Sequence, residues 1–529
     1  MMRGFPIAAF LGLCVAVGAC GGGSSGGGPP GDVRSLTGTI TFDKVTSTTA
    51  GLNYSAIVQR PVRGADVSVV EAANTTNVLG SAVTGNDGRY SLTWPLTGPA
   101  SVKVVVFART SSPKIFVEDN TSGSAIYAIA SGTVDATSTT TLDLNAPSGW
   151  TGSSYSARSS APLAVLDAAT QAVLAFRAVR PAVAFADLHI NWSANNAPIG
   201  RQSDETQAQA YAAGHIGTSH WNGTALYILG KADVDTDEFD DHVIVHEWGH
   251  YFESTLSRSD NPGGPHGAGD VKDPRLAFGE GWGNALSAMV WSPNTVYSDS
   301  SGTRQGQGFG FDLEDNTSSD PVPGWFSETS VQSILYDLFD SGSNEAFDGV
   351  ALGLGPIYDV MTGGEKNTTA LTTLYSFIAA LKAANPSQAA AIDTLTRYRN
   401  VVGVPIADAY GTGETVDGGY PANLPLYRSI TVGSGVGLTL FNDAPNALSQ
   451  NRYFRYTGNG ASHTVSIATG SSDDVDVAVY QKGALQAFAN GPTGTETTQP
   501  FTAASGVEYI IVVTGFGTSA SYTTTVTLN

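Results

Sequence analysis

The sequence has very little cysteine, and what it has stands at one end. Cys14 and Cys20 are its two cysteines in 529 residues, so nothing after Cys20 carries a thiol. A disulfide framework, a cysteine-ligated zinc site and a thiol nucleophile are therefore excluded from the rest of the chain.

Basic residues are scarce as well. The chain has 26 Lys+Arg against 47 Asp+Glu, a formal net charge of −21, and charged residues make up only 14% of it. Phosphate binding needs clustered lysine and arginine, so the composition argues against a nucleic-acid partner. The same shortage argues against peripheral binding to anionic lipid through a basic patch.

Long apolar runs are missing from the chain after its first 20 residues. No later stretch reaches the roughly 20 consecutive apolar residues that a transmembrane helix needs. The first 20 residues instead combine a positive start with a short apolar run, as export signals do. Val17-Gly18-Ala19-Cys20 resembles the bacterial lipoprotein box, which implies that Cys20 becomes the first mature residue and carries a lipid anchor in the membrane. Residues 21–34 then form a Gly/Ser/Pro tether. An ordinary secretory signal is the alternative, and in both cases the protein is exported, as a bacterial cell-envelope lipoprotein or an extracellular protein.

Residue patterns divide the remainder of the chain into three parts. Residues 35–150 and 429–529 contain short alternating strands separated by turns, which predicts two all-β sandwiches. Residues 155–425 contain the helical patterns, at 163–179, 329–339, 371–383 and 387–399, together with a strand at 185–192, and are predicted to be α+β.

Each predicted sandwich resembles a known domain family. Gly38-Thr39-Ile40, Arg63 to Val67 and Thr84 to Leu92 together resemble the carboxypeptidase regulatory-like domain. Residues 453–456, 474–480 and 509–513 resemble the bacterial pre-peptidase C-terminal domain, which is appended to secreted peptidases. Neither resemblance implies a catalytic role for its sandwich.

The strongest chemical motif is His246-Glu247-Trp248-Gly249-His250. Residues four apart share one face of a helix, so His246 and His250 can hold one Zn²⁺ between them. Glu247 is then placed to take a proton from metal-bound water. Gly249 is a poor helix former, and we expect it to allow close packing behind the metal.

A catalytic zinc needs a third protein ligand and an open position for water. Glu280, in Gly279-Glu280-Gly281-Trp282, lies thirty residues past His250. The motif and this run resemble the gluzincin metallopeptidases, the thermolysin-like group, and the fungalysin branch in particular. The resemblance implies a zincin-like catalytic domain with Glu280 as third ligand, while His266 remains a competing ligand. The metzincin spacing fails, because its Gly and His positions hold Glu253 and Leu256.

One residue departs from the gluzincin pattern. Those enzymes carry an aspartate four residues after the glutamate ligand, where it braces the first histidine, and this chain has Asn284. An amide oxygen can still accept the histidine N–H but carries no charge, so we expect somewhat weaker metal binding.

Substrate contacts are predicted on both sides of the motif. The turn and strand of residues 220–230, with Asn222, Ala225 and Tyr227, resemble the edge strand that pairs with substrate backbone in gluzincins, or form a plain structural strand. An oxyanion donor is also needed. Past Glu280 the one histidine is His463, in the C-terminal sandwich, so Tyr336 and Tyr358 are the candidates, each with a packing role as the alternative.

Aspartates crowd before the motif, at positions 233, 235, 237, 240 and 241. Carboxylates at alternate positions can coordinate Ca²⁺, but the EF-hand pattern is absent. A solvated acidic loop is the preferred interpretation, with calcium as the alternative.

Taken together, the sequence predicts an exported zinc metallopeptidase that cleaves peptide bonds of extracellular or surface proteins, as an endopeptidase. Its one catalytic Zn²⁺ polarises the scissile carbonyl and its water, and Glu247 moves the proton. The alternative is a non-catalytic, zinc-binding surface adhesin or scaffold, which Asn284 and the missing oxyanion donor favour. The retained Glu247 argues against that alternative, because a structural zinc has no use for a base.

Overall fold

The computed structural model of the chain describes residues 32–267, 269–314, 320–341, 347–470, 473–492, 494–517 and 520–529. The predicted signal peptide, the lipidated Cys20 and the tether up to residue 31 lie outside these residues. The described chain is multidomain and rich in β-sheet. It forms two compact units: the first holds the residues up to Gln171, Ala186–Ile244 and Ser298–Phe309, and the second holds Ala172–Phe185, Val245–Tyr297 and Gly310–Asn529. The predicted central domain, 155–425, is thus divided between the two units.

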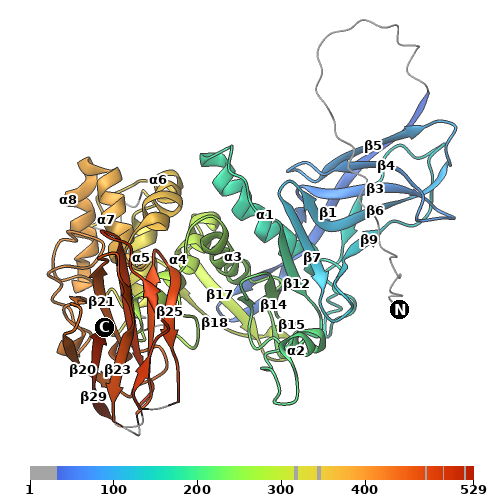
Figure 1. The fold of residues 1–529 in the computed structure, drawn as a ribbon. Coiled ribbons are helices and arrows are strands. Elements are labelled where there is room, and N and C mark those ends of the chain that lie inside the picture. The colour runs from blue at the N-terminus through green and yellow to red at the C-terminus, as the bar shows by residue number, and fades with distance from the viewer. Residues whose placement is uncertain are drawn as a thin grey trace, which may run out of the picture. The chain divides into compact units, whose positions relative to one another are not determined.

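The first unit begins with the predicted N-terminal β-structure (Figure 1). One sheet has the order β11-β1-β2, and β5 pairs with β1 as well. A second, larger sheet contains β7-β6-β3-β4, with the short β8, β9 and β10 beside it. The strands are β1 Val33–Thr48, β2 Gly51–Pro61, β3 Ala65–Glu71, β4 Val78–Val83, β5 Arg89–Pro95, β6 Ser101–Ser111, β7 Lys114–Asp119, β8 Ala125–Ile126, β9 Ala128–Ala130, β10 Val134–Asp135 and β11 Leu144–Ala146. Burial alternates residue by residue along β5 and β6, which is the signature of strands with one face in the core.

The larger sheet does not stop at the predicted domain boundary near residue 150. β7 pairs in parallel with β12 (Leu188–Trp192), β12 pairs in parallel with β14 (Leu226–Ile228), and β13 (His220–Trp221) follows β14. An exposed strand edge is readily covered by another strand, and here the covering strand comes from the predicted central domain. The first unit also holds α2 (Gln207–Ala213) and the short strands β15 (Gly230–Lys231) and β16 (Asp235–Thr236).

Helices dominate the central part of the chain. They are α1 Ala161–Val179, α3 Asp241–Thr255, α4 Pro274–Trp291, α5 Glu328–Asp337, α6 Leu354–Val360, α7 Leu374–Ala384 and α8 Ala389–Thr396, with a π-helical turn at Met361–Glu365. The helices predicted from the sequence pattern correspond to α1, α5, α7 and α8. Within the part of the chain that the structure describes, α1 alone is long and apolar enough to cross a membrane, but 67% of its window is buried inside the structure, as in a core helix. β17 (Val296–Ser301) and β18 (Gln307–Asp312) follow α4.

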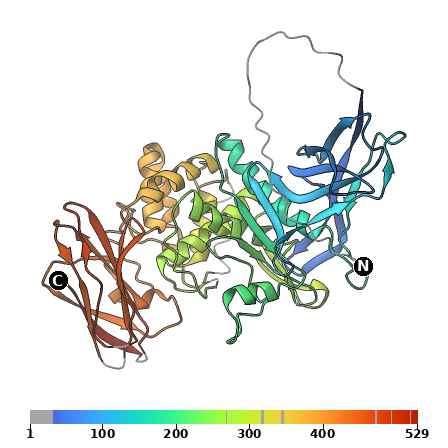
Figure 2. The same cartoon turned by 45° about the vertical axis from the view of Figure 1, so that its right-hand side comes forward.

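The C-terminal part of the second unit is a two-layer sandwich, visible in Figure 2 as the red and orange strands. One sheet has the order β19-β21-β28-β24-β25 and the other β20-β29-β23-β26. Their facing side chains form one apolar core that includes Phe454, Val477, Ile511 and Val526. The strands are β19 Tyr427–Ser429, β20 Gly435–Phe441, β21 Asn451–Thr457, β22 Ser462–His463, β23 Val465–Thr469, β24 Val475–Gln481, β25 Ala484–Ala489, β26 Glu496–Thr497, β27 Phe501–Thr502, β28 Glu508–Gly515 and β29 Ser521–Leu528. The strands predicted in this region are confirmed.

Candidate metal centre

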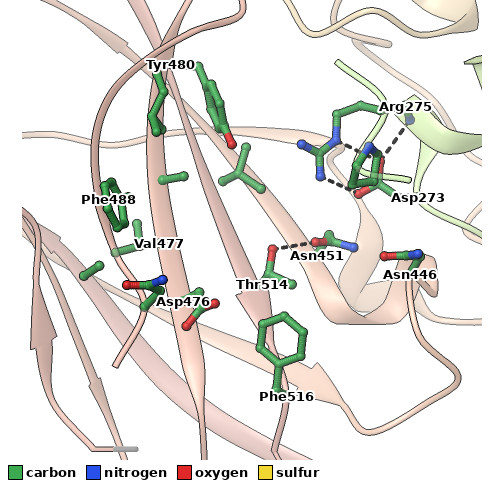
Figure 3. Close-up of a pocket in the computed structure, with 16 residues that line it drawn as sticks. Asp273, Arg275, Asn446, Asn451, Asp476, Val477, Tyr480, Phe488, Thr514 and Phe516 are labelled. Atoms are coloured by element: carbon green, nitrogen blue, oxygen red, sulfur yellow. Dashed lines mark hydrogen bonds and ion pairs between the residues drawn. The ribbon is translucent and has the colours of Figure 1, made fainter. Parts of the chain in front are cut away.

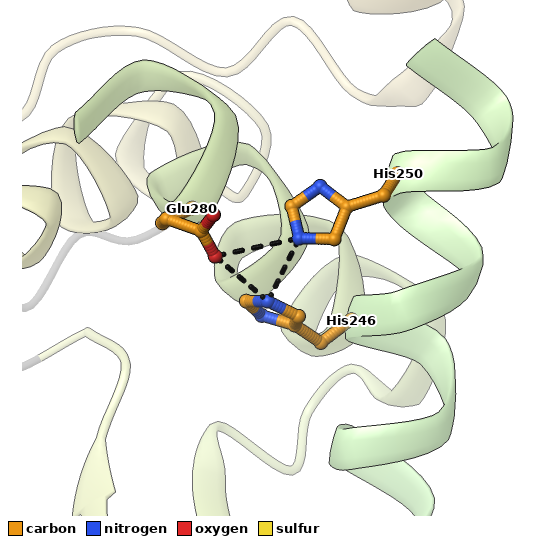
Figure 4. Close-up of side chains that lie close together, drawn as sticks. All are labelled: His246, His250 and Glu280. Carbon is orange, nitrogen blue, oxygen red and sulfur yellow. Dashed lines mark hydrogen bonds and ion pairs between the residues drawn. The ribbon is translucent and has the colours of Figure 1, made fainter. Parts of the chain in front are cut away.

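Two helices of the second unit bring three metal-ligating side chains together. α3 presents His246 and His250 one turn apart on the same face, and α4 presents Glu280 to them (Figure 4). The two Nε2 atoms are 3.1 Å apart. Oε2 of Glu280 lies 3.2 Å from Nε2 of His246 and 3.3 Å from Nε2 of His250. The three predicted ligands therefore form one triangle of ligand atoms.

This triangle has the size that a zinc ion requires. Tetrahedral Zn²⁺ holds nitrogen and oxygen ligands at about 2.0–2.1 Å, which places any two ligand atoms roughly 3.3 Å apart. The observed separations are 3.1, 3.2 and 3.3 Å. Two imidazoles and one carboxylate are also the donor set of catalytic zinc sites that keep one position for water. The residues present therefore fit zinc in both geometry and chemistry.

The charges of the triangle favour a cation at its centre. Burial alone would lower the pKa of His250, but the carboxylates of Glu280, Glu253 and Glu247 raise that pKa well above its usual value. Burial alone would raise the pKa of Glu280, but the two histidines hold that pKa well below its usual value. The carboxylates thus favour a positive charge at the centre of the triangle, as those of a metal site do.

Hydrogen bonds fix the orientation of His246. Its Nδ1 donates to Oδ1 of Asn284 at 2.7 Å, which leaves Nε2 free to face the triangle. Nδ2 of Asn284 donates in turn to Oε1 of Gln332 on α5 at 2.8 Å. Asn284 therefore occupies the bracing position that the sequence predicted, with an amide in place of a carboxylate.

The other two ligands are braced by residues that sequence reasoning missed. Nδ2 of Asn261 donates to Oε1 of Glu280 at 2.9 Å, which turns Oε2 toward the histidines. Nδ1 of His250 lies 3.4 Å from Oε2 of the fully buried Glu253, and burial raises the pKa of Glu253 to about 7, against the opposing effect of His250. Glu253 could have been suspected, because it stands three residues after His250 on the same helix. Nothing in the sequence marks Asn261.

Glycines let the elements around the metal centre approach closely. A Cβ on Gly249 would lie 3.1 Å from the Cα of Gly283, so α3 and α4 meet glycine against glycine. A Cβ on Gly279 would lie 2.7 Å from Nδ2 of Asn261, and one on Gly281 would lie 2.6 Å from a methyl group of Val331 on α5. Each glycine of the Gly279–Gly283 run therefore makes room for a different neighbour, and Gly249 has the packing role predicted for it.

His266 stands beside the triangle without joining it. Its Nε2 lies 3.4 Å from Oε2 of Glu280, and its Nδ1 lies 2.8 Å from Oε2 of Glu328. Burial would lower the pKa of His266, but Glu328 and Glu280 raise it to about 8. The group of ligand atoms that all lie within 4.8 Å of one another consists of His246, His250 and Glu280, so the structure favours Glu280 over His266 as third ligand. With 32% of its side chain exposed, His266 lies at the solvent-facing side of the site, between Glu280 and Glu328.

The two tyrosines predicted as oxyanion donors lie elsewhere. The hydroxyl of Tyr336 bonds the Ser292 side chain, and Ser292 follows Glu280 by twelve residues, about 18 Å along α4 at 1.5 Å per residue. The ring of Tyr358 packs on Phe252, which is two residues, or about 200°, around α3 from His250. These contacts fit the packing role that the sequence left as the alternative, and a donor role stays a prediction for both tyrosines.

The strand predicted to receive substrate has no open edge at its centre. Tyr227 of β14 is paired with Asn191 of β12 on one side and with His220 of β13 on the other. Asn222 and Ala225 close the turn between β13 and β14, where Oδ1 of Asn222 accepts the Ala225 N–H at 2.9 Å. Because its backbone groups are already bonded, β14 cannot add a substrate strand at Tyr227, which is thus structural. The terminal strand of this sheet is β13, at the start of the predicted segment, and substrate pairing there stays a prediction.

A cavity of about 430 Å³ lies in the second unit, away from the triangle of ligands (Figure 3). Its lining includes Asp273 and Arg275 from the start of α4 and Asp476, Tyr480 and Phe516 from the C-terminal sandwich. None of the three ligands lines it. The cavity therefore does not mark the position of a substrate at the metal centre.

Comparison with protein-family models and with curated proteins finds no match. Among solved structures, the pre-peptidase C-terminal domain of a collagenase from Bacillus anthracis is 9% identical, with 20% of this chain and 94% of that chain covered and a TM-score of 0.17. The surface-associated copper-binding protein CorA of Methylomicrobium album BG8 is 10% identical over 20% of this chain and 96% of its own, with a TM-score of 0.16. The periplasmic lysozyme inhibitor PliG of Aeromonas hydrophila is 12% identical over 20% of this chain and 99% of its own, with a TM-score of 0.14. The first is a domain of the kind that residues 429–529 resemble in sequence, but at these TM-scores the likenesses decide neither fold nor function.

Proposed function

We propose that this protein is a zinc-dependent peptidase that acts on proteins outside the cytoplasm. The observation that carries the proposal is the triangle of His246, His250 and Glu280, whose ligand atoms lie 3.1 to 3.3 Å apart. Its location rests on the export signal and on Cys20, through which we propose a lipid anchor in the membrane.

The chain's own residues supply the proton transfers. A bound Zn²⁺ would polarise the scissile carbonyl and lower the pKa of a water molecule toward about 7. Glu247 follows His246 on α3, and its charge contributes to the raised pKa of His250, so its carboxylate lies near the ligands. Glu247 accepts the proton of the attacking water and delivers it to the leaving nitrogen. His266, kept protonated by Glu328, donates a hydrogen bond to the carbonyl oxygen as negative charge develops there.

The ligand set supports catalysis over a structural role. Structural zinc sites are closed by four protein ligands, whereas catalytic sites use three and keep one position for water. Of the residues that the structure describes, His246, His250 and Glu280 are the ones whose ligand atoms group at this centre. The non-catalytic adhesin or scaffold remains the alternative, and it predicts bound zinc without turnover.

The test combines zinc analysis with digestion of casein by the purified protein and by its Glu247→Gln variant. We expect one zinc per chain in both proteins, with cleavage by the wild type alone. Loss of wild-type cleavage on chelation, and its return with added zinc, would tie activity to the metal. Equal cleavage by both proteins would refute the proposed role of Glu247. Zinc binding without cleavage of casein or of a mixed peptide library would favour the scaffold. The sizes of the first products separate internal from terminal cleavage.

A further inference from the structure

A second group of possible ligands lies in the first unit, where the sequence predicted a solvated acidic loop. Asp235 belongs to β16, Asp237 follows it, and Asp299 belongs to β17. One carboxylate oxygen from each lies within 4.8 Å of the other two. Asp237 is only 2% exposed, so this part of the loop is buried and the prediction of a solvated loop is wrong here.

Two nearby cations are engaged by other carboxylates, and the exposed Lys231, opposite Asp235 in the β15–β16 pairing, forms no ion pair with it. Nζ of Lys44 lies 2.5 Å from Oδ1 of Asp241, and the guanidinium of Arg158 pairs with Glu238. Across the described ranges, no nitrogen of lysine, arginine or histidine forms an ion pair with Asp235, Asp237 or Asp299. Three acidic groups are thus gathered in a largely buried place without an ion pair to any cation of the described residues.

Two buried oxygens of the group also lack hydrogen bonds. Oδ2 of Asp237 accepts from the Ser219 hydroxyl, but its Oδ1 has no hydrogen-bond partner among the described residues, and neither does Oδ1 of Asp235. The neighbouring Asp240 differs, because its two oxygens accept from Ser47 and from the backbone and hydroxyl of Ser300. Leaving a buried carboxylate oxygen unbonded is costly, so the orphaned oxygens indicate a missing partner.

Electrostatics point in the same direction. Burial, followed by the charges of Asp240 and Asp235, raises the pKa of Asp299 to about 8. Burial and the charge of Glu238 raise the pKa of Asp235 to about 6, and burial with its acidic neighbours raises the pKa of Asp237 well above its usual value. A divalent cation among the three would remove this repulsion.

We propose that Asp235, Asp237 and Asp299 bind one Ca²⁺ ion. The donors are carboxylate oxygens, which select hard cations over zinc. Calcium takes six to eight oxygens in flexible geometry and so suits a loose group of carboxylates better than magnesium, which demands a tight octahedron. The remaining positions would be filled by water or backbone carbonyls.

This ion would join two segments that are distant in the sequence. α3 and α4, which carry His246, His250 and Glu280, lie between Asp237 and Asp299 along the chain. Calcium would therefore fix both ends of the segment that supplies the zinc ligands. Its binding does not depend on whether the protein is a peptidase.

The test uses full-length protein stripped of metal, reloaded with one equivalent of Zn²⁺ and titrated calorimetrically with CaCl₂. Two variants each remove one proposed ligand, Asp299→Asn and Asp235→Asn, and the second lies at a partly exposed position, where a substitution disturbs the fold less. The exposed Asp204→Asn is the control. We expect each cluster variant to bind one Ca²⁺ fewer than wild type, or to bind it at least tenfold more weakly, while the control matches wild type. Without calcium, Asp299→Asn should melt at or above the wild-type temperature, because it removes a repelling charge. The rise in melting temperature on adding calcium should be smaller in each cluster variant than in the wild type and the control.

The other unit contains a comparable group, Asp474, Asp476 and Glu496, so the ion must be assigned to its site. Asp476→Asn serves this purpose. Calcium binding that is lost in Asp476→Asn but unchanged in Asp299→Asn would overturn the proposal. It would also be overturned if calcium neither bound to the wild type nor raised its melting temperature, or if MgCl₂ gave the same binding and stabilisation as CaCl₂.

Discussion

A Cβ atom on Gly283 would lie 2.9 Å from Nδ1 of His246, so α4 can pass this ligand's ring only with glycine at that position. We predict that Gly283→Ala displaces the ring and weakens zinc binding about 10- to 100-fold, the range seen when ligand orientation is disturbed. Helix propensity alone would favour the substitution, because alanine in a helix is about 1 kcal/mol more stable than glycine. A loss of zinc affinity would therefore come from the contact with the ring and not from the helix. Competition with a chromophoric chelator measures the affinity. Gly363→Ala, where a Cβ would meet nothing within 4 Å, is the control. Wild-type affinity in Gly283→Ala would contradict this account.

Asn284 offers a test of the one departure from the gluzincin pattern. Asn284→Leu removes the acceptor of the His246 N–H and should weaken zinc binding about 10- to 100-fold. Asn284→Asp should bind zinc at least as tightly as wild type, because a charged acceptor makes the ligand histidine more basic. The new aspartate would need a hydrogen-bond donor where Asn284 now donates to Gln332. Gln332 can supply it by turning its side-chain amide, because its buried Nε2 makes no hydrogen bond within the described residues. Tighter zinc binding by Asn284→Leu than by Asn284→Asp would refute the bracing role.

The proposed donor role of His266 predicts that its substitution lowers kcat without loss of zinc. His266→Ala should lower kcat by about 10²- to 10³-fold, the usual loss of one oxyanion donor, with zinc content unchanged. Glu328→Gln should give a smaller loss and move the basic limb of the pH–rate profile to lower pH, because Glu328 helps to keep His266 protonated. His189→Ala is the control, since His189 forms a similar pair with Glu118 at 3.1 Å in the first unit. Loss of zinc from His266→Ala would instead make His266 a ligand.

Asp273 holds the start of the helix that carries Glu280. Its Oδ1 accepts from the backbone and Nε of Arg275, and its Oδ2 accepts from Nη2 of Arg275 (Figure 3). The same Oδ2 also accepts from the Tyr453 hydroxyl. Asp273→Asn removes the partner of a fully buried arginine, so we predict a loss of about 3–5 kcal/mol in the free energy of unfolding. Urea unfolding measures it, with the exposed Asp204→Asn as control. A loss below about 1 kcal/mol would show that Arg275 finds another partner.

Glu365 gives the protein a pH dependence that is separate from its metal ligands. Burial raises the pKa of Glu365 to about 8, and the charges of Asp260 and Glu253 add to the rise. A hydrogen bond from Ser376 and the charge of Arg258 oppose it. A raised pKa contributes stability that is complete below the unfolded value of about 4.5 and is lost as the pH rises through about 8. Glu365→Gln should therefore be more stable than wild type at pH 8.5 and lose that advantage at pH 5.

Melting temperatures across this pH range measure the effect, with the exposed Asp204→Asn as the control variant. A wild type and a Glu365→Gln variant whose melting curves shift in parallel from pH 5 to pH 8.5 would contradict the prediction.

Local patterns in the sequence were enough to predict the strands of the C-terminal sandwich, several helices and the shared helix face of His246 and His250, whereas Glu280 came from the resemblance to gluzincins. Period-two alternation marks β21, β24 and β28, and the four-residue spacing of His246 and His250 places both on one face of α3. These features depend on neighbours within a few residues, so the chain order reveals them. The C-terminal sandwich followed in the same way, because each of its strands carries its own alternating pattern.

Interactions between distant residues were not predictable in this way. Glu328 lies far along the chain from His266, and Asp299 far from Asp237, and no local pattern links either pair. The continuation of the first sheet from β7 into β12 also escaped prediction, because parallel pairing leaves no turn signal. Tyr336 and Tyr358 were proposed by elimination among residues after Glu280, whereas the histidine beside the metal centre precedes it.

The hydrogen bond from Tyr453 to Asp273 has a consequence for the timing of assembly. Tyr453 is synthesised 180 residues after Asp273. Until β21 emerges, the carboxylate at the start of α4 lacks one partner, and Arg275 lacks the ring that later packs beside it. The first turn of the helix that carries Glu280 thus gains its last two contacts only after residue 453 has been synthesised. Removal of that sandwich by proteolysis would undo the same contact, so trimming of this chain would cost stability at the base of α4.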